Sequence, residues 1–259
     1  MKRKIPHTLI FLACFIVAAV AISFRNGAVP VISDSVEQGK KTIVIDSGHG
    51  GADGGCVGVN GCVEKDINLA IATDLQKLLE LSGFNVVMTR TEDVSIHDEG
   101  VEGLRAQKVS DMENRLKIVQ SHPDALFISI HQNQYTEPQY FGAQMFYTTN
   151  NPSNFKLAQT MQQCFRELQP NNDREIKLID NGLYLFKNTK QPALLIECGF
   201  LSNAEDAANL SDSEYQKKVA FTVYKGITSF YGGAEISNTT DVQIIGDENG
   251  ETADILYMQ

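Results

Sequence analysis

The chain has 259 residues, of which 42% are apolar and 21% are charged. This is the composition of an ordinary globular protein, long enough to bury one sizeable core. The formal net charge of −10 argues against nucleic acid as a partner. No internal period stands out, so we expect no repeat architecture.

The amino terminus combines a basic start with an apolar run. Lys2, Arg3 and Lys4 precede Thr8–Phe24, a stretch of 17 residues without a charged side chain. This pattern is typical of a signal sequence or of a single membrane anchor whose basic end stays inside, and the run is at the lower length limit for a spanning helix. A cleavage-like motif lies deep in the run, so we expect a retained anchor over residues 1–24, or secretion if it is cleaved.

Composition divides the rest of the chain into three parts. Residues 25–40 are polar and are interpreted as a linker, and residues 41–230 hold the apolar segments of a folded domain. Tyr231–Gln259 contains six acidic residues and no lysine or arginine. This composition predicts an acidic, flexible C-terminal tail.

Within residues 41–230, strand-like runs alternate with helical segments. A helix is expected over Glu64–Ser82 because its apolar residues recur about every 3.6 positions and Gly83 follows it. The alternation predicts a single-domain α/β fold, in which a mixed, largely parallel twisted sheet carries helices on both faces. The other expected helices are Ala106–Ser121, Pro152–Leu168, Ala204–Leu210 (capped by Asn203) and Ser213–Tyr231, and the expected strands are Thr42–Asp46, Asn85–Thr89, Ala125–Ile130, Ala143–Tyr147, Leu183–Phe186 and Ala193–Glu197.

Side chains that can bind metals or move protons stand where expected strands end. His49 follows the first strand, His131 follows the run LFISI, and Glu197 ends the run ALLIE. Glu64 begins the first long helix after a glycine-rich loop. Because ligands bind beyond the carboxyl ends of strands in such sheets, we expect these four side chains to share one site.

The residue types point to catalytic zinc. Two histidines and one carboxylate, with a fourth position open, are a common ligand set for that ion. Hydrolysis also needs a carboxylate outside the ligand set, which takes a proton from water and passes it to the leaving group. We assign Glu64 to one zinc ion per chain and Glu197 to proton transfer, although spacing alone does not separate these two roles.

Five stretches, in order, carry a resemblance: DSGHGGADGG, EKDINLAIA, VVMTR, SIHQN and ALLIECGFLSN. Over residues 41–230 the chain resembles the type 3 zinc-dependent N-acetylmuramoyl-L-alanine amidases, which implies a phosphorylase/hydrolase-like fold. The resemblance implies a peptidoglycan substrate, cleaved at the amide between the lactyl group of muramic acid and L-alanine. It also implies His49, Glu64 and His131 as zinc ligands and Glu197 as the catalytic glutamate.

The N-terminal anchor makes the chain most similar to the spore-cortex and germination-specific members of that family, which remove peptide stems so that muramic δ-lactam can form. We therefore expect an extracytoplasmic enzyme of the forespore cortex. Residues 132–142 leave too little chain for the plugging helix of autoinhibited relatives, so the site should be open. An activator protein or timed expression would then control it.

Three other functions remain open from the residues alone. The same zinc site would suit a vegetative cell-wall amidase or another zinc hydrolase of a wall component. A catalytically silent wall-binding protein is the alternative outside the enzymes. The presence of all four site residues argues against that last alternative, because a binding module has no need of Glu197.

Further residues are candidates for substrate binding. Arg90 and Arg115 could hold stem-peptide carboxylates in bidentate fashion, or each could form a structural ion pair. Asn133 could contact substrate or shape the turn after the second histidine. Asp53 is expected to shape its loop or to support a metal ligand.

Cys56 and Cys62 flank an Asn-Gly hairpin signal in the loop between two expected ligands. Outside the membrane a disulfide is permitted, and it would brace this loop. Free thiols are the second alternative. Thiolate ligation is the third, because a site with two cysteines and two histidines would be closed and structural.

Overall fold

Six strands form one sheet in the order β2-β1-β3-β6-β4-β5 in the computed structural model, which describes residues 40–179 and 182–232. β1, β2, β3 and β6 run parallel, β4 runs antiparallel to β6, and β5 is parallel to β4. The strands are β1 Thr42–Ser47, β2 Asn85–Met88, β3 Leu126–Asn133, β4 Gln144–Tyr147, β5 Lys177–Leu178 and β6 Ala193–Phe200; the helices are α2 Glu64–Leu81, α3 Leu104–Gln120, α4 Asn154–Leu168, α5 Tyr184–Asn188, α6 Ala204–Ser211 and α7 Ser213–Gly232. The predicted mixed α/β sheet is confirmed.

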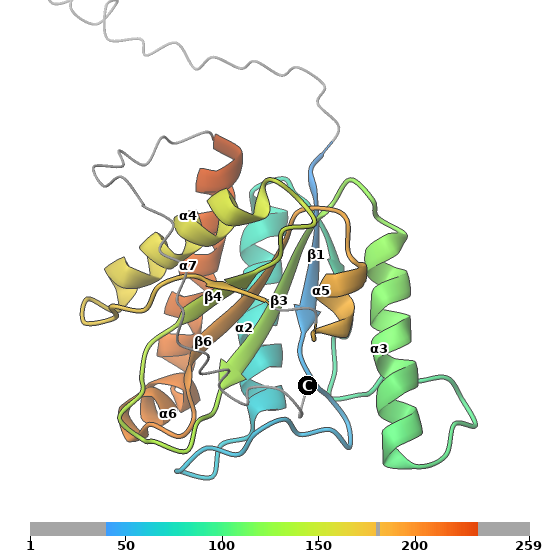
Figure 1. Ribbon diagram of the computed structural model, residues 1–259, viewed down its shortest axis with the longest axis horizontal. Helices are drawn as coiled ribbons and strands as arrows, with labels where there is room; N and C mark the ends of the chain where they lie inside the picture. Colours follow the sequence, from blue (N-terminus) through green and yellow to red (C-terminus); the bar gives the residue numbers. More distant parts are fainter. Residues whose placement is uncertain (1–39, 180–181, 233–259) are drawn as a thin grey trace, which may run out of the picture. The chain divides into compact units, whose positions relative to one another are not determined.

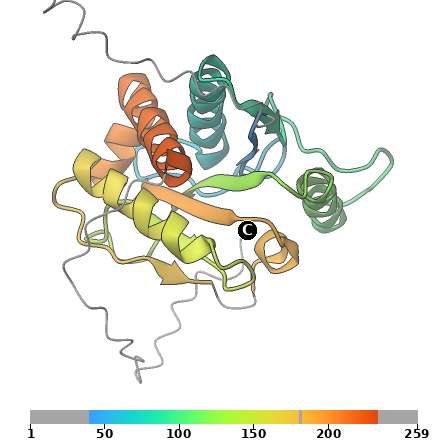
Figure 2. The same ribbon diagram turned by 90° about the horizontal axis from the view of Figure 1, so that it is seen from above.

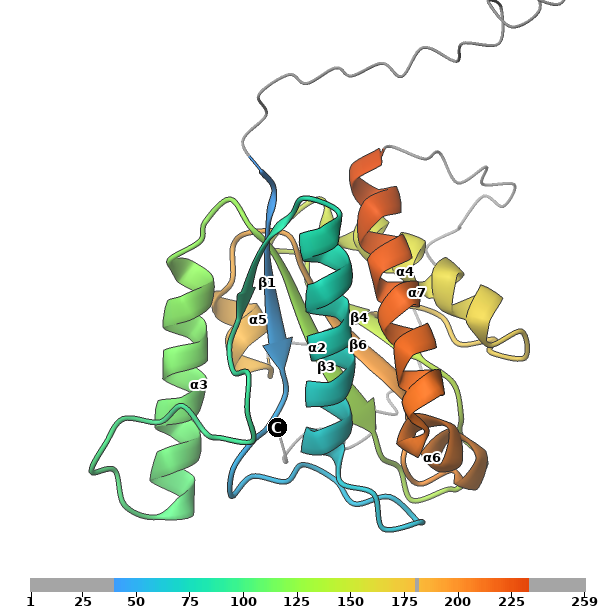
Figure 3. The same cartoon turned by 180° about the vertical axis from the view of Figure 1, so that it is seen from behind.

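Helices cover both faces of this sheet. α3 and α5 lie on the face turned toward the viewer in Figure 1, and α2 and α7 lie side by side on the opposite face in Figure 3. Figure 2 shows the strands between α5 on one side and α2 and α7 on the other. Each face has its own buried cluster, the larger formed with α2, α4 and α7 and the smaller with α3 and α5.

The first long helix shows why the sequence pattern predicts these elements well. In α2, the buried residues Ile67, Ile71, Leu75 and Leu79 form one stripe against the sheet. The helix ends as expected, because Gly83 adopts φ 87° and the backbone N–H of Phe84 returns to the carbonyl of Leu79.

Asn203 also caps α6 as predicted. Its side-chain oxygen accepts hydrogen bonds from the backbone N–H groups of Glu205 and Asp206. This cap satisfies two of the donors that the first turn of a helix leaves unpaired.

Two local predictions are wrong. Leu183–Phe186 is not a strand but leads into the short helix α5, in which Leu185 and Phe186 are buried. A short apolar run fits a buried strand or helix equally well. Pro152 does not begin α4, because Asn151 accepts from the backbone N–H of Ser153 and forms a turn that delays the helix to Asn154.

The predicted anchor over residues 1–24, nearly all of the linker and nearly all of the acidic tail lie outside the described residues. Among the helices that the structure does describe, none has the length and apolar character needed to cross a bilayer.

A buried ion pair joins α3 to the first strand beneath the site. The guanidinium of Arg115 lies 2.7 Å from Asp46 and 2.6 Å from Asp111. Thr89 and Ser129 donate further hydrogen bonds to Asp46. Burial alone raises the pKa of Asp46, but Arg115, His131 and the hydrogen bonds outweigh it and lower the pKa from 3.8 to about 2.

We expect this ion pair to set part of the acid stability. Because the folded pKa of Asp46 lies below its unfolded value, the carboxylate stabilises the fold above about pH 4, and that contribution disappears as the pH falls to about 2. The shift corresponds to about 2 kcal/mol at neutral pH. Urea unfolding should show that the free energy of unfolding falls between pH 5 and pH 2 by about 2 kcal/mol more for the wild type than for Asp46→Asn.

The exposed Asp124→Asn serves as the control for this experiment, since Asp124 lies at the surface before β3. It should keep the acid dependence of the wild type. Equal pH dependence in wild type and Asp46→Asn would contradict the assignment.

Candidate metal centre

The turn after β1 presents His49 in an unusual backbone conformation. His49 has φ 63° and is the one non-glycine residue with positive φ in the described part of the chain, a conformation that costs free energy unless the surroundings fix it. Two buried arginines do so. Arg90 donates to the carbonyls of Ser47 and Gly48, and Arg115 donates to those of Ser47 and His49.

These contacts decide between the alternatives for the two arginines. Arg90 also donates to the carbonyls of Lys65 and Glu92, and Arg115 is paired with two aspartates. Both side chains are buried. The structural alternative therefore accounts for their donors, and the expectation that they bind stem-peptide carboxylates finds no support in their contacts.

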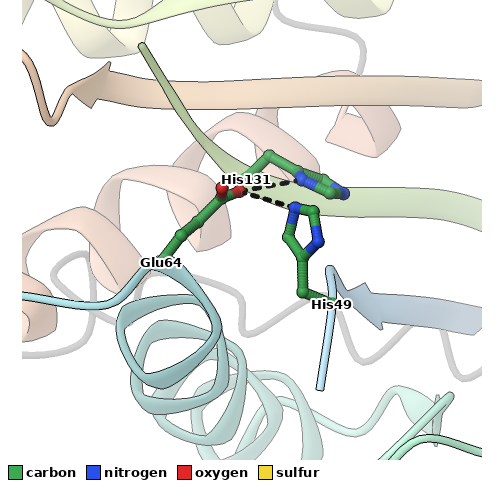
Figure 4. Close-up of side chains that lie close together, drawn as sticks. All are labelled: His49, Glu64 and His131. Atoms are coloured by element: carbon green, nitrogen blue, oxygen red, sulfur yellow. Dashed lines mark hydrogen bonds and ion pairs between the residues drawn. The ribbon is translucent and has the colours of Figure 1, made fainter. Parts of the chain in front are cut away.

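Three side chains converge at the carboxyl ends of β1 and β3 (Figure 4). The Nε2 atom of His49 lies 3.2 Å from Oε1 of Glu64, and Nδ1 of His131 lies 3.0 Å from the same oxygen. All three residues are buried, and their ligand atoms lie within 4.8 Å of one another. Among the described residues they form the one group that could hold a metal ion.

The carboxylate of Glu64 is fixed from three sides. Its Oε1 accepts from the backbone N–H of Gln132 and from the amide of Asn68, and its Oε2 accepts from the backbone N–H of Cys56. Burial raises the pKa of Glu64, but the two facing imidazoles outweigh burial and hold the pKa well below its usual range. Glu64 is therefore an oriented carboxylate, ready to act as a ligand.

Asp53 orients the other side of His49. Its Oδ2 lies 3.0 Å from Nδ1 of His49, so Nε2 is left to face Glu64. Burial lowers the pKa of His49, but Asp53 and Glu64 outweigh it and raise the pKa from 6.5 to about 9. The predicted supporting role of Asp53 matches this arrangement, in which a carboxylate fixes the ring of a metal-binding histidine.

Two glycines are needed for this close packing. A methyl group at Gly48 would lie 2.2 Å from the ring of His131, and one at Gly55 would lie 2.5 Å from Oε2 of Glu64. Gly55 also has φ 68°. The glycine-rich sequence around His49 therefore makes room for the facing side chains.

Glu197 lies next to this group on the neighbouring strand. It is the register partner of His131 in the parallel pair β3–β6, so both side chains leave the same face of strands that are about 4.8 Å apart. Glu197 is 3% exposed. Within the described residues it does not belong to the group that could hold a metal.

The cysteines do not form the expected disulfide, because both thiols are free. The hairpin register gives the reason. Hydrogen bonds place Glu64 opposite Cys56 and Gly58 opposite Cys62, which leaves the cysteines on a diagonal of about 7–8 Å, too far for an unstrained bridge. Burial and the neighbouring Glu64 raise the pKa of the Cys56 thiol, which disfavours the thiolate alternative.

Asn133 shapes the turn after His131. Its side-chain oxygen accepts from the backbone N–H of Gln134, and its carbonyl accepts from the N–H of Leu201. These contacts match the alternative in which Asn133 forms the turn. Residues 134–143, all of them described, contain no helix, as expected for a site without a plug.

Sequence reasoning missed Asn68 and Gln132, which position Glu64. Asn68 lies four residues after Glu64 on the buried face of α2 and is 0% exposed. A polar side chain within an apolar helical stripe is the signal that could have identified it, because buried polar groups need partners. No comparable signal identifies Gln132, which acts through its backbone N–H.

We predict that Gly48→Ala disrupts metal binding. The added methyl group would displace the His131 ring, and a displaced ligand should weaken affinity for Zn²⁺ at least about tenfold. Competition with a chromophoric chelator measures this affinity. Gly54→Ala is the matched control, since a methyl group there meets one atom, at 3.4 Å. Equal affinities of the two variants would refute the proposed packing.

Metal uptake should also depend on pH. His49 must lose its proton to bind a metal, and its pKa in the metal-free protein is about 9. Affinity for Zn²⁺ should therefore rise about tenfold per pH unit between pH 6.5 and 8.5. Calorimetry in buffers of different ionisation enthalpy would detect the released proton, and a pH-independent affinity would argue against this assignment.

Comparison with known proteins finds amidases. Residues 43–229 match the family model described as N-acetylmuramoyl-L-alanine amidase. The chain is 39% identical over 191 residues to the germination-specific N-acetylmuramoyl-L-alanine amidase of Bacillus subtilis (strain 168), covering 74% of this chain and 80% of that protein. It is 32% identical over 213 residues to the amidase LytC of the same organism, and this match covers 79% of this chain and 40% of that protein.

Solved structures of amidases share the fold. The CwlD amidase from Clostridioides difficile, solved in complex with the GerS lipoprotein, is 37% identical with a TM-score of 0.72, covering 75% of this chain and all of that chain. The catalytic domain of CwlV from Bacillus (Paenibacillus) polymyxa is 30% identical with a TM-score of 0.63, and the match covers 74% of this chain and 98% of that chain. The chain therefore belongs to the N-acetylmuramoyl-L-alanine amidase family and is a hydrolase of an amide bond in peptidoglycan.

Proposed function

We propose that this chain is a zinc-dependent amidase that removes stem peptides from the peptidoglycan of the spore cortex. The observation that carries the proposal is the convergence of His49, Glu64 and His131 beside Glu197. The proposal has three parts, which are the metal, the role of Glu197 and the biological setting.

The three converging side chains suit zinc. A tetrahedral zinc ion with ligands at its usual bond lengths separates neighbouring ligand atoms by about 3.3 Å. The nitrogen–oxygen distances of 3.2 and 3.0 Å at Glu64 are close to that value. Two imidazoles and one carboxylate leave the fourth position open. When bound, zinc would lower the pKa of a coordinated water and polarise the scissile carbonyl.

Glu197 would move the protons. It projects from the strand beside His131, on the same face, and needs no part in holding the metal. Its carboxylate would take a proton from the attacking water and deliver it to the nitrogen of L-alanine as the amide bond breaks. The lactyl carboxylate and the free amine of the stem peptide would then be the two products.

The relatives support the proposed biological setting. The germination-specific amidase is 39% identical, and we assign this chain the corresponding step, in which peptide stems are removed and muramic δ-lactam forms. Residues 1–24 would anchor it outside the cytoplasmic membrane. Because the C. difficile CwlD amidase was solved with the GerS lipoprotein, an activator protein at the membrane surface is part of the proposal.

Glu197→Gln tests the chemistry. The substitution keeps shape and removes the base, so activity should fall at least about a hundredfold while bound zinc stays at one ion per chain. Mass spectrometry of digested cortex peptidoglycan should find intact glycan with free lactyl carboxylates and released stems.

The same digests separate the alternatives. Cleavage of a different bond would indicate another zinc hydrolase. Release from vegetative wall but not from cortex would favour a vegetative amidase. Binding to peptidoglycan without any cleavage by the zinc-loaded wild type would identify a wall-binding protein and end the proposal.

A further inference from the structure

A cleft of about 330 Å³ leads from the surface to the two histidines of the metal centre. It lies between α3 and α5, which stand on the same face of the sheet (Figure 1). Its lining includes His49 and His131, Val109 and Met112 of α3, and Leu183–Phe186 at and before the start of α5. A substrate group that reaches the metal centre through this cleft passes between the two helices.

The α3 side of the cleft carries two cationic side chains. Arg105, Lys108 and Met112 line it together, and their spacing of three and four residues places them on one face of the helix. Lys108 lies 3.4 Å from Asp53, the residue that orients His49. Arg105 is exposed and forms no ion pair with any described residue.

The position of Arg105 is unfavourable for the helix itself. It lies in the first turn of α3, where the backbone N–H groups carry partial positive charge and acidic residues are preferred. That turn contains no acidic residue, and its N-cap residue Gly103 provides no side-chain cap. A residue that opposes a local preference of this kind, and makes no stabilising contact in return, is a candidate for a functional role.

The other charged side chains that line the cleft are paired with one another. Arg115 is paired with Asp46 and Asp111 at the base of the cleft, and Asp53 is shared between His49 and Lys108. Arg105 is therefore the charge that a ligand can neutralise. The cleft thus suits a ligand with an apolar body and an anionic group that faces α3.

We propose that Arg105, assisted by Lys108, binds a carboxylate of the stem peptide and so favours substrates that carry a free carboxylate near the scissile amide. This inference rests on the proposed function. Glycan strands of muramic acid and glucosamine are neutral once the lactyl group is in amide linkage, whereas the stem peptide bears carboxylates. The positive charge of Arg105 and Lys108 therefore suits the α3 side of the cleft to the stem peptide and not to the glycan.

Two substrates isolate this interaction: N-acetylmuramoyl-L-alanyl-D-glutamate, with a free α-carboxylate, and N-acetylmuramoyl-L-alanyl-D-isoglutamine, in which that group is a carboxamide. For the zinc-loaded wild type, kcat/KM should be about tenfold higher with the carboxylate, as expected for one charge-assisted hydrogen bond. Arg105→Gln should abolish the preference through KM, and Arg105→Glu should reverse it. Lys108→Gln should reduce it by a smaller factor.

Lys117→Gln is the matched control. Lys117 is an exposed lysine of the same helix that does not line the cleft, so this variant should keep the wild-type preference. Because Arg105 is exposed and lies in the first turn of α3, its variants should unfold at or slightly above the wild-type temperature. No preference in the wild type, or a preference that survives in Arg105→Gln, would overturn the inference.

A binding experiment separates this inference from the proposed function. Calorimetry with the Glu197→Gln variant measures affinity for the two compounds without turnover. Tighter binding of the carboxylate that disappears in Arg105→Gln/Glu197→Gln would support the subsite even if the wild type cleaved neither compound. Equal affinities for both compounds would overturn the subsite even if the wild type proved to be an amidase.

Discussion

The convergence of two imidazoles on one carboxylate is the interaction on which this structure depends. Glu64 faces both histidines through a single oxygen. Such an arrangement would be costly for a buried carboxylate unless other groups satisfied it. The backbone of Gln132 and Cys56 and the amide of Asn68 do so. The acid is thus held in place by β3, by the loop before α2 and by α2 itself.

The arginines beneath the site likewise hold buried groups in place by hydrogen bonds. A histidine with positive φ needs a backbone that cannot relax, and Arg90 and Arg115 supply six hydrogen bonds in total to carbonyl oxygens near that turn and to those of Lys65 and Glu92. Arg115 in turn is neutralised by Asp46 and Asp111. Arg90 and Arg115 together carry as much positive charge as Asp46 and Asp111 carry negative charge beneath the candidate metal centre, and Arg105 on the α3 side of the cleft is not part of this group.

Much of this arrangement could be predicted from the sequence, because it follows from regular patterns. The strands that place His49, His131 and Glu197 are continuous apolar runs, and parallel pairing brings their ends together. The stripe of α2 and the cap at Asn203 are equally local signals. β5 was not predicted, since its two exposed residues, Lys177 and Leu178, carry no strand pattern.

The remaining features depend on pairing across the fold, which a single sequence does not display. The donors of Arg90 find backbone carbonyls whose positions are set by β1 and α2. The hairpin signal between Cys56 and Cys62 was sound, but the register that separates the thiols is visible only in the hydrogen bonds. The run Leu183–Phe186 became helical in a place where α3 and the sheet bury two of its side chains.

Anomalous diffraction at the zinc edge, from crystals of the described domain grown with Zn²⁺, tests the central claim most directly. The account predicts one anomalous peak per chain, at about 2.0–2.2 Å from Nε2 of His49, a carboxylate oxygen of Glu64 and Nδ1 of His131, with Glu197 beyond bonding distance. A peak bound by Glu197 in place of Glu64, or no peak between the two histidines, would contradict it.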